Sequence, residues 1–362
     1  MSNRETIDLD ALTANYHDCR DNVAPATCAA VVKADAYGLG ITRIATALYH
    51  AGCRHFFTAT HREGIALREL LGEADVFVFE GVTAESAAAF REHALIPVLI
   101  TPAQSAAWAQ SAREQGKPLP AVVDIDTGMT RLGFGERELR QLVDQGDDLE
   151  WLDIRYVLTH LACADEGGSA STDRQLERFE RLRSLLPPAP TSIGNSAGSL
   201  LGPASAGDLA RVGLALIGGN PFLDETHRAR PVLRIQSRIL QLRQVDESTP
   251  VGYGATHTAA PGTRIATVGT GYADGYPWSL GNRGVAVIGG HRVPVIGRVS
   301  MDLITLDVSG LADELVQPGC LVDLIGPDIS LEEVAQRAGT INYEILTRLS
   351  QRARRRYLGG TS

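Results

Sequence analysis

One lysine, Lys33, stands where the chain changes from apolar to polar, and its surroundings are those of a reactive amine. It ends the apolar run 29–32 and is followed by the segment 34–40, which holds Tyr37, Gly38 and Gly40. Apolar surroundings disfavour the charged ammonium and lower its pKa, and an uncharged lysine amine attacks carbonyl groups, as Schiff-base lysines do. In the plainer interpretation, the lysine stem packs on a strand end and its ammonium reaches water.

Several other polar residues follow apolar runs in the same way. In a parallel barrel, active residues come from the C-terminal ends of the strands and the loops after them, so these side chains are expected on one rim. A single histidine in such a place is more often structural, but a whole set on one rim favours a catalytic site. Arg211 is the exception, because it begins the last predicted strand. The residues at or after the predicted strand ends are Lys33, Asp124, Asp126, Arg131, His160, Asn195 and Ser196.

The types of these residues suit one cofactor. The segment 195–198 offers a hydroxyl and backbone N–H groups at a predicted helix start, which suits a phosphate. Tyr37 lies one turn beyond Lys33, where its phenol could reach the same phosphate, and Gly38 and Gly40 permit close backbone approach. An aldehyde cofactor that bears a phosphate and needs a lysine is pyridoxal 5′-phosphate.

The elements that must position these residues form a repeating pattern from about residue 27 to 219. Short β-rich runs alternate with amphipathic stretches, as in β-α units on a parallel sheet. Eight such runs fit a closed (β/α)8 TIM barrel, although an eighth helix is not evident. The predicted strands are 28–33, 55–58, 76–79, 97–100, 121–125, 155–159, 191–193 and 211–217, and the predicted helices are 41–50, 62–71, 84–93, 102–115, 136–144, 172–185 and 197–201.

The pattern changes after Asn220 and Pro221, and the predicted fold is an α/β barrel followed by a mostly β C-terminal domain. Apolar runs punctuated by Gly and Pro indicate antiparallel strands at 232–245, 264–269, 284–295, 301–308 and 320–325. Ser330 and Glu333 have capping-box spacing before the helical stretch 334–338. The predicted domains are 1–222 and 223–362, and the segment 4–9 could pair with either.

Composition excludes several classes of protein. The 362 residues are 44% hydrophobic and 21% charged, which suits a soluble globular chain of two or three domains. The net charge of −9 and the lack of a long basic stretch argue against nucleic-acid and membrane partners, and the basic cluster 352–356 is expected to be a solvated face rather than an internal anchor. The charged N-terminus lacks a signal-peptide core, which predicts a cytoplasmic protein. Five scattered cysteines indicate reduced thiols and no zinc site.

Motifs along nearly the whole chain resemble those of bacterial alanine racemases, a fold-type III family of pyridoxal phosphate enzymes. The resemblance begins with the lysine segment VVKADAYGLG at 31–40 and continues in order into the second domain. The other matching segments are DTGMTRLG at 126–133, THLA at 159–162, NSA at 195–197, RVG at 211–213, GYGAT at 252–256, GYADGYP at 271–277, GRVSMD at 297–302 and NYEIL at 342–346.

The resemblance implies a two-base racemisation in which Lys33 acts on one face of the substrate and Tyr253, supplied by the partner subunit of a homodimer, acts on the other. A tyrosine is a poor base at neutral pH, and His160, in contact with Arg211, is implied to activate it. Arg211 is implied to keep the pyridine nitrogen unprotonated, which favours racemisation over transamination. The implied cofactor-binding residues are Lys33, Tyr37, His160, Asn195, Ser196, Arg211, Gly213 and Tyr343, and the implied substrate-binding residues are Arg131, Met301 of the partner subunit and Tyr272 at the entrance.

This sequence departs from the family pattern in three places. Where the family commonly has a carbamylated lysine that orients the arginine matching Arg131, this chain has Asp124. We hypothesise that Asp124 supplies that negative charge without CO2, with an anion or a water making up its shorter reach. The other departures are 217–219 and 60–62, and both bear on the periphery of the pocket.

Three alternatives stay open beside alanine racemisation for the supply of D-alanine to a cell wall of peptidoglycan. A racemase of serine, lysine or several amino acids has the same fold. A non-catalytic pyridoxal phosphate-binding protein shares the barrel and the lysine, but it lacks a second domain with Tyr253, Tyr272 and Met301. An amino-acid decarboxylase of related plan would be expected to use a carboxylate in place of Arg211.

Overall fold

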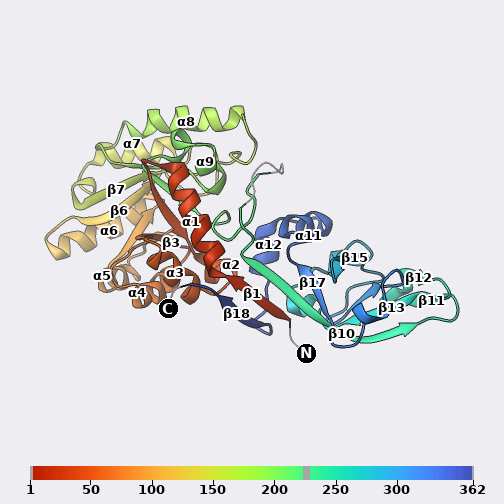
Figure 1. Cartoon of the computed structure of the whole chain (residues 1–362). Coiled ribbons are helices and arrows are strands. Elements are labelled where there is room, and N and C mark those ends of the chain that lie inside the picture. Colours follow the sequence, from red (N-terminus) through yellow and green to blue (C-terminus); the bar gives the residue numbers. More distant parts are fainter. Residues whose placement is uncertain (1–2, 223–228, 361–362) are drawn as a thin grey trace.

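A computed structural model describes residues 3–222 and 229–360, and its N-terminal part is the predicted barrel of parallel strands with helices outside it (Figure 1). Eight strands follow the order β8-β7-β6-β5-β4-β3-β2-β9, and Ser192 on β8 donates its hydroxyl to the carbonyl of Leu209 on β9 at 2.7 Å, which closes the ring. The strands are β2 (Thr27–Val31), β3 (His55–Thr58), β4 (Asp75–Val78), β5 (Leu95–Leu99), β6 (Leu119–Asp124), β7 (Leu152–Leu158), β8 (Thr191–Ser192) and β9 (Leu209–Val212).

One helix of the ring, α1 (Leu9–Val23), comes from before the first barrel strand and was not predicted. It packs against β2, α3 and α9, and thereby takes the place of the eighth helix that the sequence pattern lacks. Asp8 caps its first turn by accepting from Ala11 N at 2.9 Å. The other helices of this part are α2 (Lys33–Tyr37), α3 (Ile41–His50), α4 (His61–Leu70), α5 (Ala87–Glu92), α6 (Pro102–Gln115), α7 (Glu136–Gln145), α8 (Ala170–Arg183), α9 (Ser196–Leu200) and α10 (Pro203–Ala206), with the 3-10 turn η1 (Leu149–Trp151).

The predicted strand 211–217 was wrong at both ends, and the difference changes the position of Arg211. Strand β9 ends at Val212, and the apolar residues after it form tight turns, with Leu216 N donating to Gly213 O at 3.0 Å. A short buried apolar run has the same pattern in a strand and in buried turns, which is why the sequence did not separate them. Arg211 therefore lies near the C-terminal end of its strand, like the other rim residues.

A second sheet follows the barrel, and the N-terminal strand belongs to it. Strand β1 (Arg4–Asp8) pairs antiparallel with β10 (Leu233–Gln244) and parallel with the last strand, β18 (Arg354–Leu358), which answers the question that the sequence left open. The predicted domain boundary after residue 222 borders 223–228, outside the described residues. The remaining elements are β11 (Thr249–Val251), β12 (His257–Ala259), β13 (Arg264–Val268), β14 (Val285–Ile288), β15 (His291–Pro294), β16 (Ile304–Asp307), β17 (Leu321–Ile325), α11 (Leu331–Ala338), α12 (Asn342–Thr347), η2 (Tyr253–Ala255), η3 (Tyr272–Asp274), η4 (Trp278–Leu280) and η5 (Asp313–Leu315).

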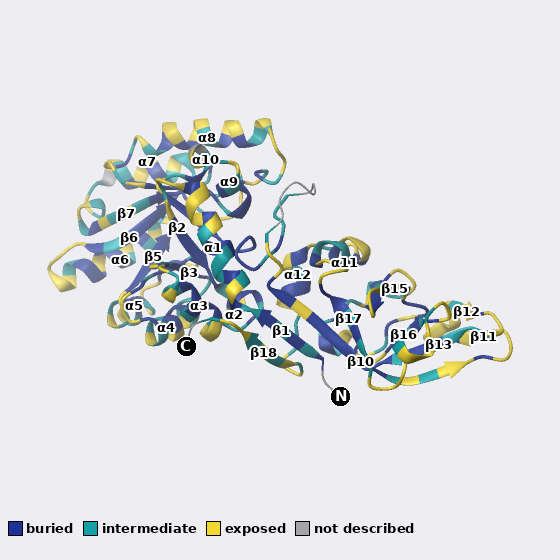
Figure 2. Cartoon of the chain, in the orientation of Figure 1, coloured by how far each residue is buried: buried dark blue, intermediate teal, exposed yellow. Residues whose placement is uncertain are grey.

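The basic cluster 352–356 is in part an internal anchor, which corrects the expectation of a solvated face. Arg355 donates to the carboxylate of Glu5 at 2.7 Å, and Glu5 is only 1% exposed. Its neighbours Arg354 and Arg356 point to solvent, because side chains alternate along β18. Figure 2 shows the buried barrel strands and the mostly buried first half of β10.

Two smaller expectations have clear outcomes. Ser330 caps α11 as predicted, accepting from Glu333 N at 3.2 Å, but the Glu333 carboxylate binds arginines and not the cap. All five cysteines are free thiols. Across residues 3–222 and 229–360, helices of the length and apolar character needed to cross a membrane are absent.

Candidate active site

Lys33 is followed by a backbone turn of the left-handed kind. The residues from Ala34 to Tyr37 are not glycines, yet their φ angles lie between 53° and 56°. Each such residue costs roughly 1–2 kcal/mol against the right-handed form. The turn is held by Gly38 N, which donates to Ala34 O at 2.8 Å, and by Ile41 N, which donates to the Asp35 carboxylate at 2.7 Å. Strain of this kind persists only where the surroundings over-determine it, and it clusters at functional sites.

The second sheet supports the outside of this turn. Tyr357 on β18 donates its hydroxyl to Leu39 O at 2.8 Å, and the Arg355 guanidinium lies 3.7 Å from the Asp35 carboxylate. A Cβ on Gly38 would lie 2.5 Å from Leu346 O, so only glycine allows α12 to approach so closely. The C-terminal strand and helix therefore fix the loop that carries Lys33.

The charges around Lys33 favour an uncharged amine. Burial is the largest cause that lowers the Lys33 pKa, and the cations Arg131 and Arg211 lower it further, while Glu63 opposes them. The Lys33 ammonium nitrogen lies 5.7 Å from the centre of the Phe79 ring. An amine with a lowered pKa is available to attack a carbonyl group at a lower pH than an exposed lysine.

Arg211 is the most deeply buried charged group of the rim, with 2% exposure. Its guanidinium donates to Ser192 Oγ at 2.7 Å, to Thr159 O at 2.8 Å and to Ile193 O at 3.2 Å. Burial lowers its pKa to about 10, against the opposing charge of Asp124. These bonds fix the guanidinium in place as a permanent cation facing the interior of the site.

His160 lies beside Arg211 and is neutral. The Arg211 guanidinium is 3.3 Å from His160 Nδ1, and an arginine can only donate, so Nδ1 accepts and the ring hydrogen sits on Nε2. Burial lowers the pKa of His160 to about 3, and the charges of Arg211, Arg131 and Lys33 contribute in that order. His160 thus presents an N–H donor from its free side.

A buried glutamine that sequence reasoning missed holds the His160 loop. Gln175 on α8 is 2% exposed, donates to His160 O at 3.0 Å and to Thr127 Oγ1 at 3.1 Å, and accepts from Ala162 N at 2.8 Å. Its signal in the sequence was a polar residue on the same helical face as Phe179 and Leu182.

Asp124 ends β6 and is 8% exposed. Burial raises its pKa to about 7, with the positive charges of Arg211 and Arg131 opposing and the charge of Asp126 adding to the rise. Asp126 has a structural role. Its carboxylate accepts from Gly128 N and Thr130 N, both at 3.0 Å, and thereby shapes the loop that carries Arg131.

A cradle of small and hydroxyl-bearing residues lies between α9, β9 and the Lys33 turn. Ser196 Oγ accepts from Gly213 N at 3.1 Å and from Ala215 N at 3.4 Å. A Cβ on Gly213 would lie 2.1 Å from the Tyr37 hydroxyl, so a glycine is required there. The rings of Tyr37 and Tyr343 lie 6.0 Å apart, and burial raises the pKa of both phenols.

Asn195 caps α9, the helix that begins at this cradle, by accepting from Gly198 N at 2.9 Å.

The two segments at the pocket periphery that depart from the family pattern, 60–62 and 217–219, make contacts that hold the fold. Thr60 Oγ1 caps α4 by accepting from Glu63 N at 3.3 Å, and His61 Nδ1 lies 2.6 Å from Glu80. A Cβ on Gly218 would lie 2.4 Å from Arg230 O, where the chain leaves the barrel.

Tyr253, Met301 and Tyr272 lie outside the barrel. Tyr253 is 71% exposed in the turn of the β11–β12 hairpin, a separate two-stranded sheet that Figure 1 shows beyond the end of the second sheet farthest from α2. Asn282 ties this tip to the loop leading to Met301, because it donates to Thr256 Oγ1 at 3.0 Å and accepts from Gly297 N at 2.6 Å. Within one chain, Tyr253 is thus not brought to Lys33.

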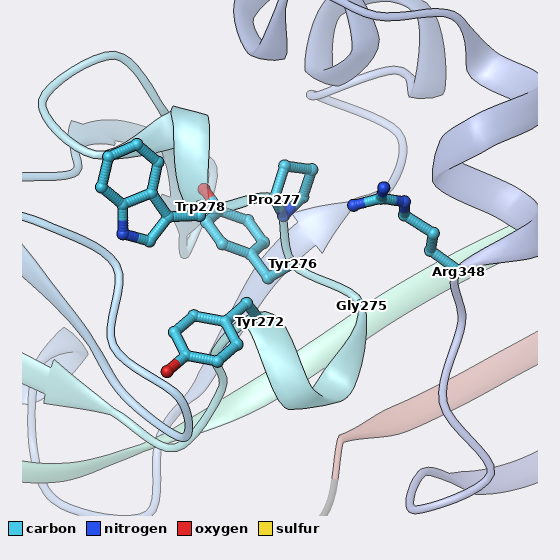
Figure 3. A pocket seen from close by; sticks show the side chains of 6 residues that line it. All are labelled: Tyr272, Gly275, Tyr276, Pro277, Trp278 and Arg348. Atoms are coloured by element: carbon cyan, nitrogen blue, oxygen red, sulfur yellow. The ribbon is translucent and has the colours of Figure 1, made fainter.

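Tyr272 faces a surface pocket that none of the rim residues lines (Figure 3). The rings of Tyr272 and Trp278 flank it and are exposed in the single chain, and Arg348 reaches toward it from the other side. The residues that line the pocket are Tyr272, Gly275, Tyr276, Pro277, Trp278 and Arg348.

Comparisons with known proteins agree along the whole chain. The family model "Alanine racemase, N-terminal domain" matches residues 7–221, and "Alanine racemase, C-terminal domain" matches residues 232–357. An alanine racemase of Rhodospirillum rubrum is 45% identical over 356 residues, covering 98% of this chain and 95% of the relative.

Solved structures give the same result. The alanine racemase of Bartonella henselae, crystallised with covalently bound pyridoxal phosphate, superposes with a TM-score of 0.95 at 37% identity and covers 99% of this chain and 100% of its own. The biosynthetic alanine racemase of Pseudomonas aeruginosa superposes with a TM-score of 0.91 at 33% identity, covering 99% of each chain. The chain therefore belongs to the alanine racemase family.

Proposed function

We propose that this chain interconverts L-alanine and D-alanine with pyridoxal 5′-phosphate as its cofactor, in a homodimer whose subunits share their active sites. The observation that carries the proposal is the meeting of a lysine of lowered pKa with a buried arginine and a neutral histidine at one rim of the barrel. Family membership supplies the reaction and the cofactor.

The cradle beside Lys33 suits the cofactor. The Tyr37 hydroxyl packs directly on the backbone of Gly213, so close that a Cβ there would overlap it, and Ser196 begins a helix next to it. Tyr37, Asn195, Ser196, Gly213 and Tyr343 would hold the phosphate end, while Lys33 would hold the aldehyde carbon. When bound, pyridoxal phosphate supplies a carbonyl for amines and a ring that withdraws electrons from the neighbouring carbon.

Arg211 limits that electron withdrawal. Its bonds to Ser192, Thr159 and Ile193 fix the guanidinium, so Arg211 would meet the ring nitrogen of a bound cofactor as a cation, and a second positive charge there would be costly. By keeping that nitrogen unprotonated, Arg211 would favour racemisation over transfer of the amino group.

Lys33 of one subunit and Tyr253 of the partner subunit move the proton at the α-carbon, each on one face of the substrate. The Nε2–H of His160 is the donor that would stabilise the ionised phenol of that tyrosine, because Nδ1 is taken by Arg211. Arg131, from the same subunit as Lys33, and Met301 of the partner subunit would hold the substrate carboxylate. Asp124 would orient Arg131, and Tyr272 would narrow the entrance.

The dimer is inferred from the position of Tyr253. Its exposed ring sits on the hairpin far from α2 in the same chain, and Met301 and Trp278 are exposed in loops of the same C-terminal part, as expected of surfaces that a second copy covers. Five free thiols suit a reducing cytoplasm, and D-alanine made there would supply peptidoglycan synthesis.

The decisive experiment follows L-alanine in deuterated water with the purified protein, by optical rotation and by deuterium at the α-carbon. We expect racemisation with incorporation of solvent deuterium, and weaker exchange with serine and lysine. Faster exchange with serine or lysine would change the substrate, and cofactor binding without any exchange would indicate a non-catalytic binding protein.

A mixing experiment tests the shared sites. Lys33→Ala and Tyr253→Phe are each expected to be inactive, but subunits exchanged between them form hybrid dimers with one intact site. Roughly a quarter of wild-type activity per chain is then expected after mixing. Mixing that restores no activity, although hybrid dimers are detected, would contradict the sharing of sites.

A further inference from the structure

One carboxylate, that of Glu63, joins the loops that follow two neighbouring barrel strands. Glu63 lies in the first turn of α4, just after β3. Its Oε1 accepts from Ala34 N at 2.8 Å, directly after Lys33, and its Oε2 accepts from Ala59 N at 2.8 Å and from Thr60 N at 3.3 Å. Both oxygens are thus used, one on each loop.

The bond to Ala34 comes where the backbone needs it. Ala34 begins the left-handed turn, and its N–H has no strand partner there, since β2 ends at Val31. Ala34 is exposed, so this bond replaces one to water, but its carboxylate acceptor is charged and fixed, and it holds the first residue of the strained turn in place. The Glu63 carboxylate therefore offsets part of the cost of the conformation that presents Lys33.

The same carboxylate is close enough to act on the charge of Lys33. The groups that face this amine are Arg131 from the loop after β6, Arg211 on β9, the neutral His160 after β7 and Phe79 after β4. Among the groups acting on the Lys33 pKa within the described chain, Glu63 is the negative one.

We infer that Glu63 is a positioning residue for Lys33, one that locks the strained turn behind the lysine to the loop after β3 and balances the cations around the amine. This inference rests on the proposed function, in which Lys33 captures the aldehyde of pyridoxal phosphate. Glu63 acts through its bonds to the loops after β2 and β3.

The test measures the rate at which the full chain, freed of cofactor, captures added pyridoxal phosphate between pH 6 and pH 10, by the absorbance change. Only the uncharged amine attacks, so the midpoint of the rate against pH reports the Lys33 pKa, and the plateau reports the placement of the amine. The variants are Glu63→Gln, Glu63→Asp and the matched control Glu138→Gln, which alters a comparable glutamate that binds Gly135 N at 3.0 Å at the start of α7.

Glu63→Gln removes the charge and one of the two acceptors, because its amide nitrogen can only donate. We expect its plateau to fall at least roughly tenfold and its midpoint to move down by about one pH unit. Glu63→Asp keeps the charge but cannot span both loops, so its plateau is expected to fall while its midpoint stays. Glu138→Gln is expected to match the wild type in both.

Each outcome is decisive. A fall in the plateau of Glu63→Gln without a lower midpoint would indicate a merely structural glutamate, and an unchanged plateau in both Glu63 variants would overturn the inference outright. Circular dichroism of each variant shows whether the fold is kept. If Glu63→Gln does not fold, the plateau of the capture rate of Glu63→Asp tests the inference. If the wild type and Lys33→Ala bind the cofactor alike, the proposed function fails instead.

Discussion

Arg211 donates a hydrogen bond to Nδ1 of His160 at 3.3 Å, and this contact fixes which nitrogen of the imidazole carries the hydrogen. An arginine cannot accept, so the imidazole must be neutral with its hydrogen on Nε2. The pair therefore offers a fixed cation toward the interior and an N–H donor toward the mouth of the barrel. Arg211 is thus a positive charge and His160 a neutral hydrogen-bond donor, although the two side chains are in contact.

The neutral state of His160 has a consequence for stability. Its pKa is lowered to about 3, whereas the unfolded chain takes up the proton near the ordinary value of 6.5, so folding loses stability as the pH falls from 6.5 toward 3. His160→Gln keeps an acceptor for Arg211 but cannot titrate. We expect the free energy of unfolding of the variant, relative to that of the wild type, to rise by about 2 kcal/mol as the pH falls from 7 to 5. Urea unfolding of the cofactor-free chain measures this difference, and parallel pH profiles would contradict it.

Asp124 predicts the opposite pH dependence. Its folded pKa of about 7 lies above the ordinary 3.8, so the folded chain holds a proton that the unfolded chain lacks between these values, and stability is lost as the pH rises through 7. Asp124→Asn removes that loss. The difference in the free energy of unfolding, variant minus wild type, is expected to be roughly 3 kcal/mol more favourable at pH 8 than at pH 4.5. Denaturant unfolding at the two pH values tests it, and an equal difference at both would refute the buried titration.

The role of Asp124 toward the substrate makes a separate prediction. If its carboxylate orients Arg131, then Asp124→Ala raises the KM for alanine about tenfold, since an interaction with a charged group of 1–3 kcal/mol is lost. Because the charge belongs to the side chain itself, wild-type activity is expected to be the same in CO2-free buffer. An Asp124→Ala enzyme with unchanged KM and kcat would sink this hypothesis.

Much of the site was predictable because its residues follow buried strands. Lys33, His160 and Asn195 come after apolar runs whose strands are confirmed, and polar residues at such places lie on one rim whatever the loops between them do. The pairing of His160 with Arg211, implied by family resemblance, is present although the end of β9 was predicted wrongly.

What the sequence did not reveal depends on tertiary context. Helix α1 escaped prediction because its buried face includes Asn15, Tyr16 and Cys19 among its leucines, and Asn15 is buried only because Leu216 O and Arg230 O accept from it. Glu63 and Gln175 resemble surface residues of amphipathic helices, and their partners are backbone groups of distant loops, which no local pattern indicates.

Gly213 offers a steric prediction. A Cβ there would lie 2.1 Å from the Tyr37 hydroxyl, so Gly213→Ala must displace a phenol that is almost fully buried. We expect affinity for pyridoxal phosphate to fall about tenfold and stability to fall by roughly 1–2 kcal/mol. The control is Gly167→Ala, where a Cβ meets no atom within 4 Å. Equal cofactor dissociation constants for the two variants, measured by fluorescence titration, would show that the close contact is unimportant.

The ion pair between Glu5 and Arg355 joins the two ends of the chain, and it supplies the last prediction. Burial raises the pKa of Glu5 while Arg355 opposes that rise, so removing the arginine leaves a buried carboxylate without its partner. Arg355→Ala is expected to lose about 3–5 kcal/mol at pH 8, and less at pH 5, because the Glu5 pKa then rises further and protonation relieves the charge. Adding Glu5→Gln should recover much of the loss, whereas Arg356→Ala, exposed on the same strand, should cost under about 1 kcal/mol. Thermal and urea unfolding of the four chains measure these differences. A loss for Arg355→Ala that is independent of pH would mean that the arginine contributes through its ion pair with Asp35 and not by pairing the buried charge of Glu5.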